Sequence, residues 1–143
     1  MGYISLDQAR TIIAAALAHG RQLGLKPLSV AVLDSGSHLI AFERQDGSST
    51  LRAQIATGKA AGALALGLSS RRIGEMAAER PSFIASLGTI APAGLIPAAG
   101  GVIVVDEAGR AIGAVGVTGD TSDNDELCAL AGIAAAKLRA QDA

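Results

Sequence analysis

Hydrophobic residues near the start of the chain recur at steps of three and four. Ser5-Leu6-Asp7-Gln8 forms a capping box, in which the Ser5 and Gln8 side chains each bond a free backbone group at a helix start. The helical spacing then continues, and Gly24 followed by Pro27 provides the stop. The pattern predicts a helix over about residues 6–23, with its apolar face at Leu6, Ala9, Ile12, Ile13, Ala16, Leu17 and Leu23.

Two pairs of short apolar runs flank turn-rich segments. Residues 28–33 and 38–43 flank Asp34-Ser35-Gly36-Ser37, and residues 102–105 and 111–117 flank Asp106-Glu107-Ala108-Gly109. Each pair predicts a β-hairpin. Asp34 begins the first turn and Asp106 begins the second, each at the same place relative to the apolar runs that flank it. This correspondence hints at an internal repeat.

Helical patterns fill the rest of the chain. An Ala-rich helix is expected from about Thr50 to Leu68, and Ser69 or Ser70 can cap a shorter one that ends before Pro81. Ser122 can cap a last helix that reaches about Arg139, with acidic residues favourably placed in its first turn. The order α, ββ, αα, ββ, α predicts an α+β fold in one domain, residues 1–143, with helices flanking a largely antiparallel sheet of hairpins.

Residues 81–105 carry no charge, and the stretch is long enough to span a bilayer. Prolines and glycines interrupt it repeatedly. We therefore expect a buried loop followed by a strand, and not a transmembrane helix.

Composition narrows the expected partners. The formal net charge is −1 and there are three aromatic residues, so neither phosphate neutralisation nor base stacking is favoured and nucleic acid is not an expected partner. Cys128 is the lone cysteine, and the chain does not open with a basic and then apolar targeting segment. These features predict a cytoplasmic protein without a membrane anchor, and the Ala- and Gly-rich apolar helices predict a homo-oligomer.

Lys59 is the only charged residue between residues 53 and 70. It lies on the helical stripe of Ile55, Ala63 and Leu66, beside the apolar face. In one interpretation its stem covers apolar surface while the ammonium reaches water. In the other, a partly desolvated ammonium binds an anionic ligand or acts as a nucleophile or base.

Polar residues also mark the ends of the second strand. His38 can ligate a metal or haem iron, but no second His, Cys or carboxylate stands at a recognisable spacing, and a solvated histidine beside a turn is the alternative. Arg44, followed by Asp46-Gly47, can hold a carboxylate, and an internal pair between Arg44 and Asp46 accounts for the pattern equally well.

Glycines suggest where backbone can approach a ligand. Residues 94–101, with Pro97 and Gly100-Gly101, can line a cleft for a small ligand, or can simply form a buried linker. The spacing of Gly113, Gly116 and Gly119 differs from the dinucleotide-binding fingerprint. The acidic residues after Gly119 lack the pattern of a calcium loop, so no metal site is predicted.

Several segments, in this order, resemble the GlcG/HbpS-like family. They are Val32-Leu33-Asp34 with Gly36, residues 38–44 (HLIAFER), Asp46-Gly47, Lys59-Ala60, Pro97, Gly100-Gly101 and residues 113–119 (GAVGVTG). The resemblance covers nearly the whole chain. It implies an α/β/α-like domain with a central antiparallel sheet that assembles into homo-oligomers, in contexts of glycolate use, cobalamin adenosyltransferases or haem sensing.

The residues and the resemblance together predict a cytoplasmic oligomer that binds a small molecule. The expected small molecule is an organic acid or an oxygenated catabolic intermediate. Lys59 is the candidate catalytic residue, although the sequence leaves open whether there is turnover. A haem or corrinoid binding or sensing protein without turnover is the alternative, with haem as candidate cofactor, and an assembly partner without a ligand is a third. The predicted ligand-binding residues are Asp34, His38, Arg44, Asp46, Lys59, Pro97, Gly100, Gly101 and Gly116.

Overall fold

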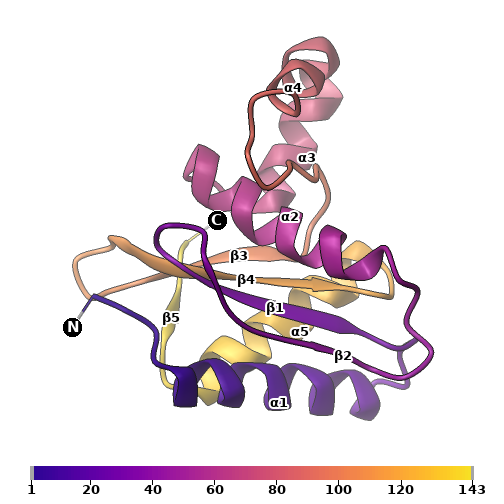
Figure 1. Cartoon of the computed structure of the whole chain (residues 1–143), viewed down its shortest axis with the longest axis vertical. Helices are drawn as coiled ribbons and strands as arrows, with labels where there is room; N and C mark the ends of the chain where they lie inside the picture. Colours follow the sequence, from indigo (N-terminus) through magenta and orange to yellow (C-terminus); the bar gives the residue numbers. More distant parts are fainter. Residues whose placement is uncertain (1, 143) are drawn as a thin grey trace.

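The computed structural model describes residues 2–142. Helices and strands follow one another in the order shown in Figure 1. Their bounds are α1 (Leu6–Gln22), β1 (Ser29–Asp34), β2 (Leu39–Arg44), α2 (Arg52–Leu66), α3 (Ser70–Glu79), α4 (Pro81–Leu87), β3 (Gly101–Val105), β4 (Ala111–Thr118), α5 (Ser122–Ala135) and β5 (Arg139–Ala140).

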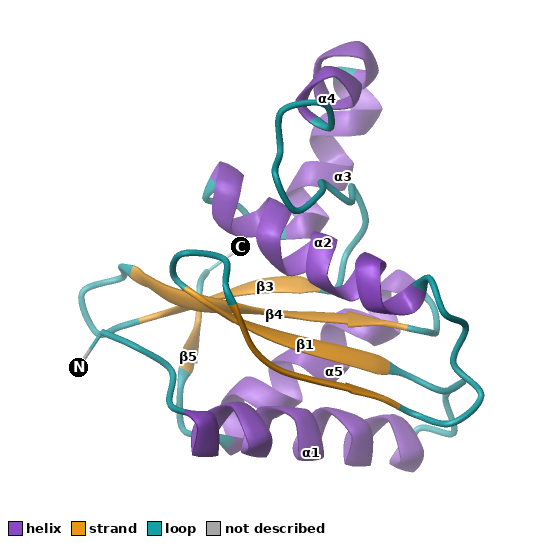
Figure 2. Ribbon diagram, in the orientation of Figure 1, coloured by secondary structure: helices purple, strands orange, loops and turns teal. Residues whose placement is uncertain are grey.

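The strands form one antiparallel sheet in the order β2-β1-β4-β3-β5. Helices α1 and α5 cover one face and α2 covers the other, while α3 and α4 project away from the sheet as an arm (Figures 1 and 2). The predicted α+β fold with a central antiparallel sheet flanked by helices is therefore confirmed.

The larger core lies between the sheet and the α1–α5 pair. It is built from aliphatic side chains that follow the predicted periods of helix and strand, among them Ile12, Ile13, Val30, Val32 and Val115, all fully buried. Burying one such side chain contributes about 1.5–3 kcal/mol. On the opposite face, small residues such as Ala60 and Ala114 let α2 pack closely against the strands.

The two hairpins repeat the same local geometry. The Asp34 carboxylate accepts hydrogen bonds from the backbone N–H groups of Gly36 and His38, and the Asp106 carboxylate accepts the corresponding bonds from Ala108 and Arg110. A strand irregularity precedes each turn at matching positions, between Val32 and Leu33 and between Val104 and Val105. The repeat suggested by the sequence is thus present in the backbone.

The segment after Pro81 differs from its prediction. Residues 81–87 form helix α4 with Pro81 in the first turn, where a missing N–H costs nothing, and Phe83 and Ile90 are exposed. The expectation of a buried loop followed by a strand was therefore wrong for this first part, although β3 does follow. Among the described residues, no helix combines the length and apolar character needed to cross a membrane.

The C-terminal helix also differs in its ends. The Thr121 side chain, and not Ser122, caps its start by accepting from the Asn124 N–H. Helix α5 ends at Ala135, because Lys137 adopts a left-handed conformation with φ of 60°, and the chain then pairs with β3 as β5. The helix predicted to about Arg139 was therefore too long.

Candidate functional site

A cavity of about 490 Å³ opens between the end of α1 and the end of β2. It brings together two predicted ligand-binding residues, Arg44 and Asp46, with Arg21, which sequence reasoning missed. The sequence signal that could have indicated Arg21 is its spacing from Leu17, because the two residues lie one helical turn apart on a single face. The complete lining is Leu17, Gly20, Arg21, Leu25, Pro27, Glu43, Arg44, Gln45 and Asp46.

Long-range hydrogen bonds hold the mouth of this cavity in place. The Gln45 side chain accepts from the Leu28 N–H at 2.6 Å, and the Gln45 N–H donates to the Leu28 carbonyl at 2.9 Å. The neighbouring Lys26 N–H donates to Asp120 at 3.0 Å. These bonds fix the α1–β1 loop against the end of β2 and against the segment that follows β4.

The cavity lining combines apolar side chains with two guanidinium groups and with the carboxylates of Glu43 and Asp46. Leu17, Leu25 and Pro27 supply the apolar side. Within residues 2–142, neither Arg21 nor Arg44 forms an ion pair with a carboxylate, including the internal pair with Asp46 that the sequence suggested. Both guanidinium groups are therefore available to an anionic ligand.

His38 and Asp34 lie at the opposite end of β2 from this cavity. The Nδ1 of His38 is 3.2 Å from Asp34 Oδ1, and the His38 side chain is 82% exposed. The backbone N–H of His38 is the main cause that lowers the pKa of Asp34. The length of β2, 6 residues or roughly 20 Å of extended chain, separates His38 from the cavity, so this histidine does not reach it within one chain.

Lys59 is buried, with a side chain only 3% exposed. Its ammonium donates to the Val117 carbonyl at 3.0 Å and to Asp125 at 3.1 Å. Burial lowers the pKa of Lys59, and the Asp125 carboxylate opposes this shift. The interpretation that this ammonium reaches water is therefore wrong, and its role as a ligand contact stays a prediction.

The predicted glycine positions lie where backbones approach closely. A Cβ at Gly116 would overlap the Ala56 carbonyl, and one at Gly101 would overlap the Lys59 carbonyl, so both glycines let α2 pack on the sheet. A Cβ at Gly100 would lie 2.8 Å from the Lys59 ammonium, and one at Gly74 would lie 2.9 Å from the Pro97 carbonyl. These contacts match the linker interpretation of residues 94–101. The cavities at the two ends of the sheet are lined by other residues, so they give the cleft interpretation no support.

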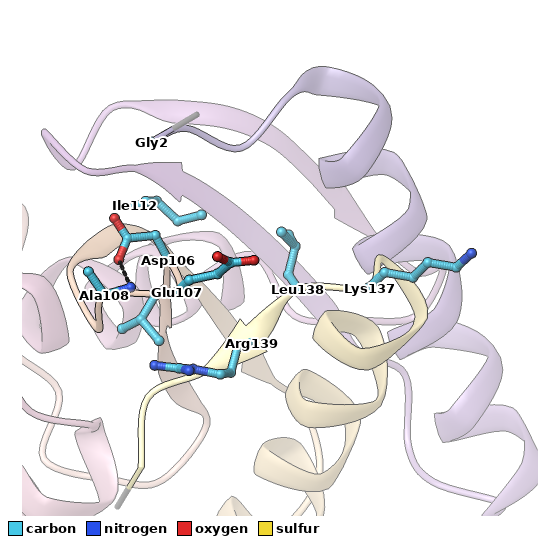
Figure 3. Close-up of a pocket in the computed structure, with 9 residues that line it drawn as sticks. Gly2, Asp106, Glu107, Ala108, Ile112, Lys137, Leu138 and Arg139 are labelled. Atoms are coloured by element: carbon cyan, nitrogen blue, oxygen red, sulfur yellow. Dashed lines mark hydrogen bonds between the residues drawn. The ribbon is translucent and has the colours of Figure 1, made fainter.

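Two further cavities lie at the other end of the sheet. The larger, about 590 Å³, is formed by the β3–β4 turn and residues 137–139 (Figure 3). A smaller one of about 390 Å³ adjoins it at Ile112 and Leu138. Neither contains a residue predicted from the sequence. Within residues 2–142, no group of three or more His, Cys, Asp or Glu side chains is placed to hold a metal ion.

A protein family and several solved structures are similar to this chain. A family model described as haem degrading protein HbpS-like matches residues 4–134. The crystal structure of HbpS has 27% identity and a TM-score of 0.79, over 92% of this chain and 89% of that chain. The Klebsiella pneumoniae protein ORFY has 25% identity and a TM-score of 0.83, over 94% and 90%.

A crystal structure of a PduOC complex with haem shares the fold, with a TM-score of 0.86 at 19% identity over 98% of this chain and 99% of that chain. No match was found among curated proteins. The family model spans most of the chain, in agreement with the resemblance seen in the sequence. The chain belongs to the HbpS-like haem degrading protein family.

Proposed function

We propose that this protein binds haem, without turnover, in the cavity between α1 and β2. The family description names haem, HbpS is a relative at 27% identity, and the PduOC structure of the same fold is a haem complex. This support favours the alternative interpretation of the sequence over an organic acid as the primary ligand. We further propose that the protein is a cytoplasmic homo-oligomer.

The observation that carries the proposal is a cavity in which apolar side chains stand beside two guanidinium groups that form no ion pair within residues 2–142; the carboxylates of Glu43 and Asp46 also line it. Haem has an apolar macrocycle and two propionate carboxylates. Leu17, Leu25 and Pro27 offer the macrocycle an apolar contact, while Arg21 and Arg44 offer each carboxylate a charged partner. The volume of about 490 Å³ lies within the range of roughly 300–1,000 Å³ that is usual for small-molecule sites.

The cavity of one chain contains none of the common axial ligands of haem iron. His, Cys, Met and Tyr are all absent from its nine lining residues. Elsewhere in the chain, burial raises the pKa of Cys128 to about 11, which disfavours the thiolate that would bind iron. A single chain therefore offers haem apolar contacts and cationic partners for its carboxylates but no ligand for the iron, and we expect weak binding.

Bound haem would supply an iron centre for redox or oxygen chemistry. The residues of this chain would bind and orient it. The same guanidinium pair also suits a small organic acid, and this is the competing function. Lys59 is a weaker candidate for that ligand because Val117 and Asp125 already occupy its ammonium.

Hemin titration followed by Soret absorbance tests the proposal. We expect a saturable shift with the unaltered protein and about fivefold weaker binding for Arg21→Ala or Arg44→Ala, since each exposed charged contact is worth about 1 kcal/mol. Arg110→Ala, an exposed arginine in the β3–β4 turn, is the matched control and should bind normally. Absence of a shift with the unaltered protein, together with calorimetric binding of glycolate that depends on Arg44, would replace haem by an organic acid.

A further inference from the structure

Lys59 and Asp125 form a buried ion pair that the proposed haem site does not use. The two side chains are only 3% and 2% exposed, and neither residue lines the cavity between α1 and β2. Taking two charges out of water is costly, so a buried pair is by itself weak evidence of a stabilising role. The hydrogen bonds around the pair therefore indicate what it holds in place.

The Asp125 carboxylate joins two donors that come from different parts of the chain. Its Oδ2 accepts from the Lys59 ammonium at 3.1 Å, and its Oδ1 accepts from the Asp120 N–H at 3.0 Å. The same ammonium donates to the Val117 carbonyl at 3.0 Å, near the end of β4. Because each carboxylate oxygen holds one donor, the pair fixes the segment that leads from β4 into α5.

Asp120 extends this connection to the α1–β1 loop. Its Oδ1 accepts from the Lys26 N–H at 3.0 Å, and its Oδ2 accepts from the Asn124 side chain at 2.9 Å. The preceding Gly119 lies directly against the same loop, since a Cβ at this position would overlap the Pro27 carbonyl. Residues 119–120 thus hold the loop both by a hydrogen bond and by close packing.

The α1–β1 loop supplies part of the cavity wall. Leu25 and Pro27 line the cavity, and they flank Lys26 in the sequence. Two hydrogen bonds between Leu28 and Gln45, of 2.6 and 2.9 Å, attach the loop to the end of β2 as well. A wall that is held in place before the ligand arrives favours binding, because less conformational freedom is lost when the complex forms.

We infer that the Lys59–Asp125 pair positions this cavity wall, acting through Asp120 and the Lys26 N–H. The pair then affects ligand binding without contacting the ligand, although Lys59 comes from α2, on the opposite face of the sheet from α1 (Figure 1). The competing interpretation is that the pair only packs α2 against α5. Measured coupling between the pair and the loop separates the two. The effect on haem binding rests on the proposed haem function.

Amide exchange in the ligand-free protein, read by NMR, tests the connection. We expect the Lys26 amide to exchange about fivefold faster in Asp120→Ala, which removes its acceptor. Asp120→Asn should behave like the unaltered protein, because its amide oxygen can still accept. Lys59→Met combined with Asp125→Leu leaves no buried charge alone, and should also speed exchange at Lys26. If that variant does not fold, Asp125→Asn makes the same test, because it offers one acceptor oxygen to two donors.

Arg71→Ala is the matched control for these variants. Arg71 forms ion pairs with Asp123 and Glu126, so its removal detaches α3 from the first turns of α5 and leaves the Asp125 bonds in place. Exchange at Lys26 should therefore not change. Unchanged exchange when Asp120 or the buried pair is altered would overturn the connection, and so would an equal acceleration by Arg71→Ala.

Hemin titration followed by Soret absorbance tests the effect on binding. We expect about two- to fivefold weaker binding for Asp120→Ala and for the variants of the buried pair, and normal binding for Asp120→Asn. Asp106→Ala should also bind normally, since that carboxylate accepts two hydrogen bonds at the other end of the sheet. Faster exchange at Lys26 with unchanged hemin affinity would overturn the role in binding. Failure of the unaltered protein to bind hemin would instead overturn the haem function, and the exchange measurement would still decide the connection.

Discussion

Lys59 and Asp125 form a pair that binds α2 to α5 inside the protein. Replacing Lys59 by Met leaves the Asp125 carboxylate buried without its cation, and we expect a loss of about 3–5 kcal/mol in the free energy of unfolding. Urea denaturation measures this. The double variant with Asp125→Leu should recover part of the loss, because it removes the buried charge but also removes the hydrogen bonds to the Val117 carbonyl and from the Asp120 N–H. A Lys59→Met protein as stable as the parent would contradict this structural role.

Sequence reasoning identified Lys59 but not its partner. Its isolation in an apolar helix was visible, whereas Asp125 looked like a favourable charge at a helix start. They are 66 positions apart in the sequence and meet only because α2 and α5 both pack against the same strand, β4. A single sequence contains no signal for such a contact, so the pair is a result of packing alone.

Asp120 provides a prediction on acid stability. Hydrogen bonds to its carboxylate, first from the Asn124 side chain and then from the Lys26 backbone, lower its pKa to about 2 from 3.8. A carboxyl with a lower pKa in the folded than in the unfolded chain stabilises the fold above the unfolded pKa. This contribution is present above about pH 4 and is lost as the pH falls towards about 2. Unfolding measured across that range should vary less steeply with pH for Asp120→Asn, and an unchanged slope would contradict this.

At the level of elements, the repeat of hairpins gives a matched pair of substitutions. Ser37 and Gly109 occupy the same turn position with φ of 68° and 84°, a region that disfavours side chains. We expect Ser37→Gly to stabilise the fold by about 0.5–1 kcal/mol and Gly109→Ser to destabilise it by a similar amount. Thermal unfolding of both variants checks this. Equal changes of the same sign would show that the two turns are not equivalent.

The elements that the sequence predicted well are those that depend on local pattern. Helix α1, with its capping box, and both hairpins lie within about two residues of their expected ranges, since their periods and turns are encoded in neighbouring residues. The sequence does not predict helix α4, because Pro81 ends the preceding helical pattern and the same residue type also begins helices. The short strand β5 depends on pairing with β3, which no local pattern records.

At the level of the whole molecule, the candidate site depends on long-range packing that local sequence patterns do not reveal. Arg44 and Asp46 were found because they mark the end of a strand. Arg21 became part of the site only because α1 lies across the sheet with its last turn beside that strand end. Asp34 and His38 were also predicted, but they lie at the other end of β2 from the cavity.

The arm formed by α3 and α4 is the part of the molecule least supported by the rest. Among the helices and strands of residues 2–142, α4 packs only against α3, whereas α2 lies on the sheet and supplies the buried Lys59 (Figure 1). Segments with little packing open locally at a low free-energy cost. Hydrogen exchange read by mass spectrometry should therefore show residues 81–92 exchanging at least about 100-fold faster than residues 56–63 of α2. Equal protection of the two segments would contradict this low local stability of the arm.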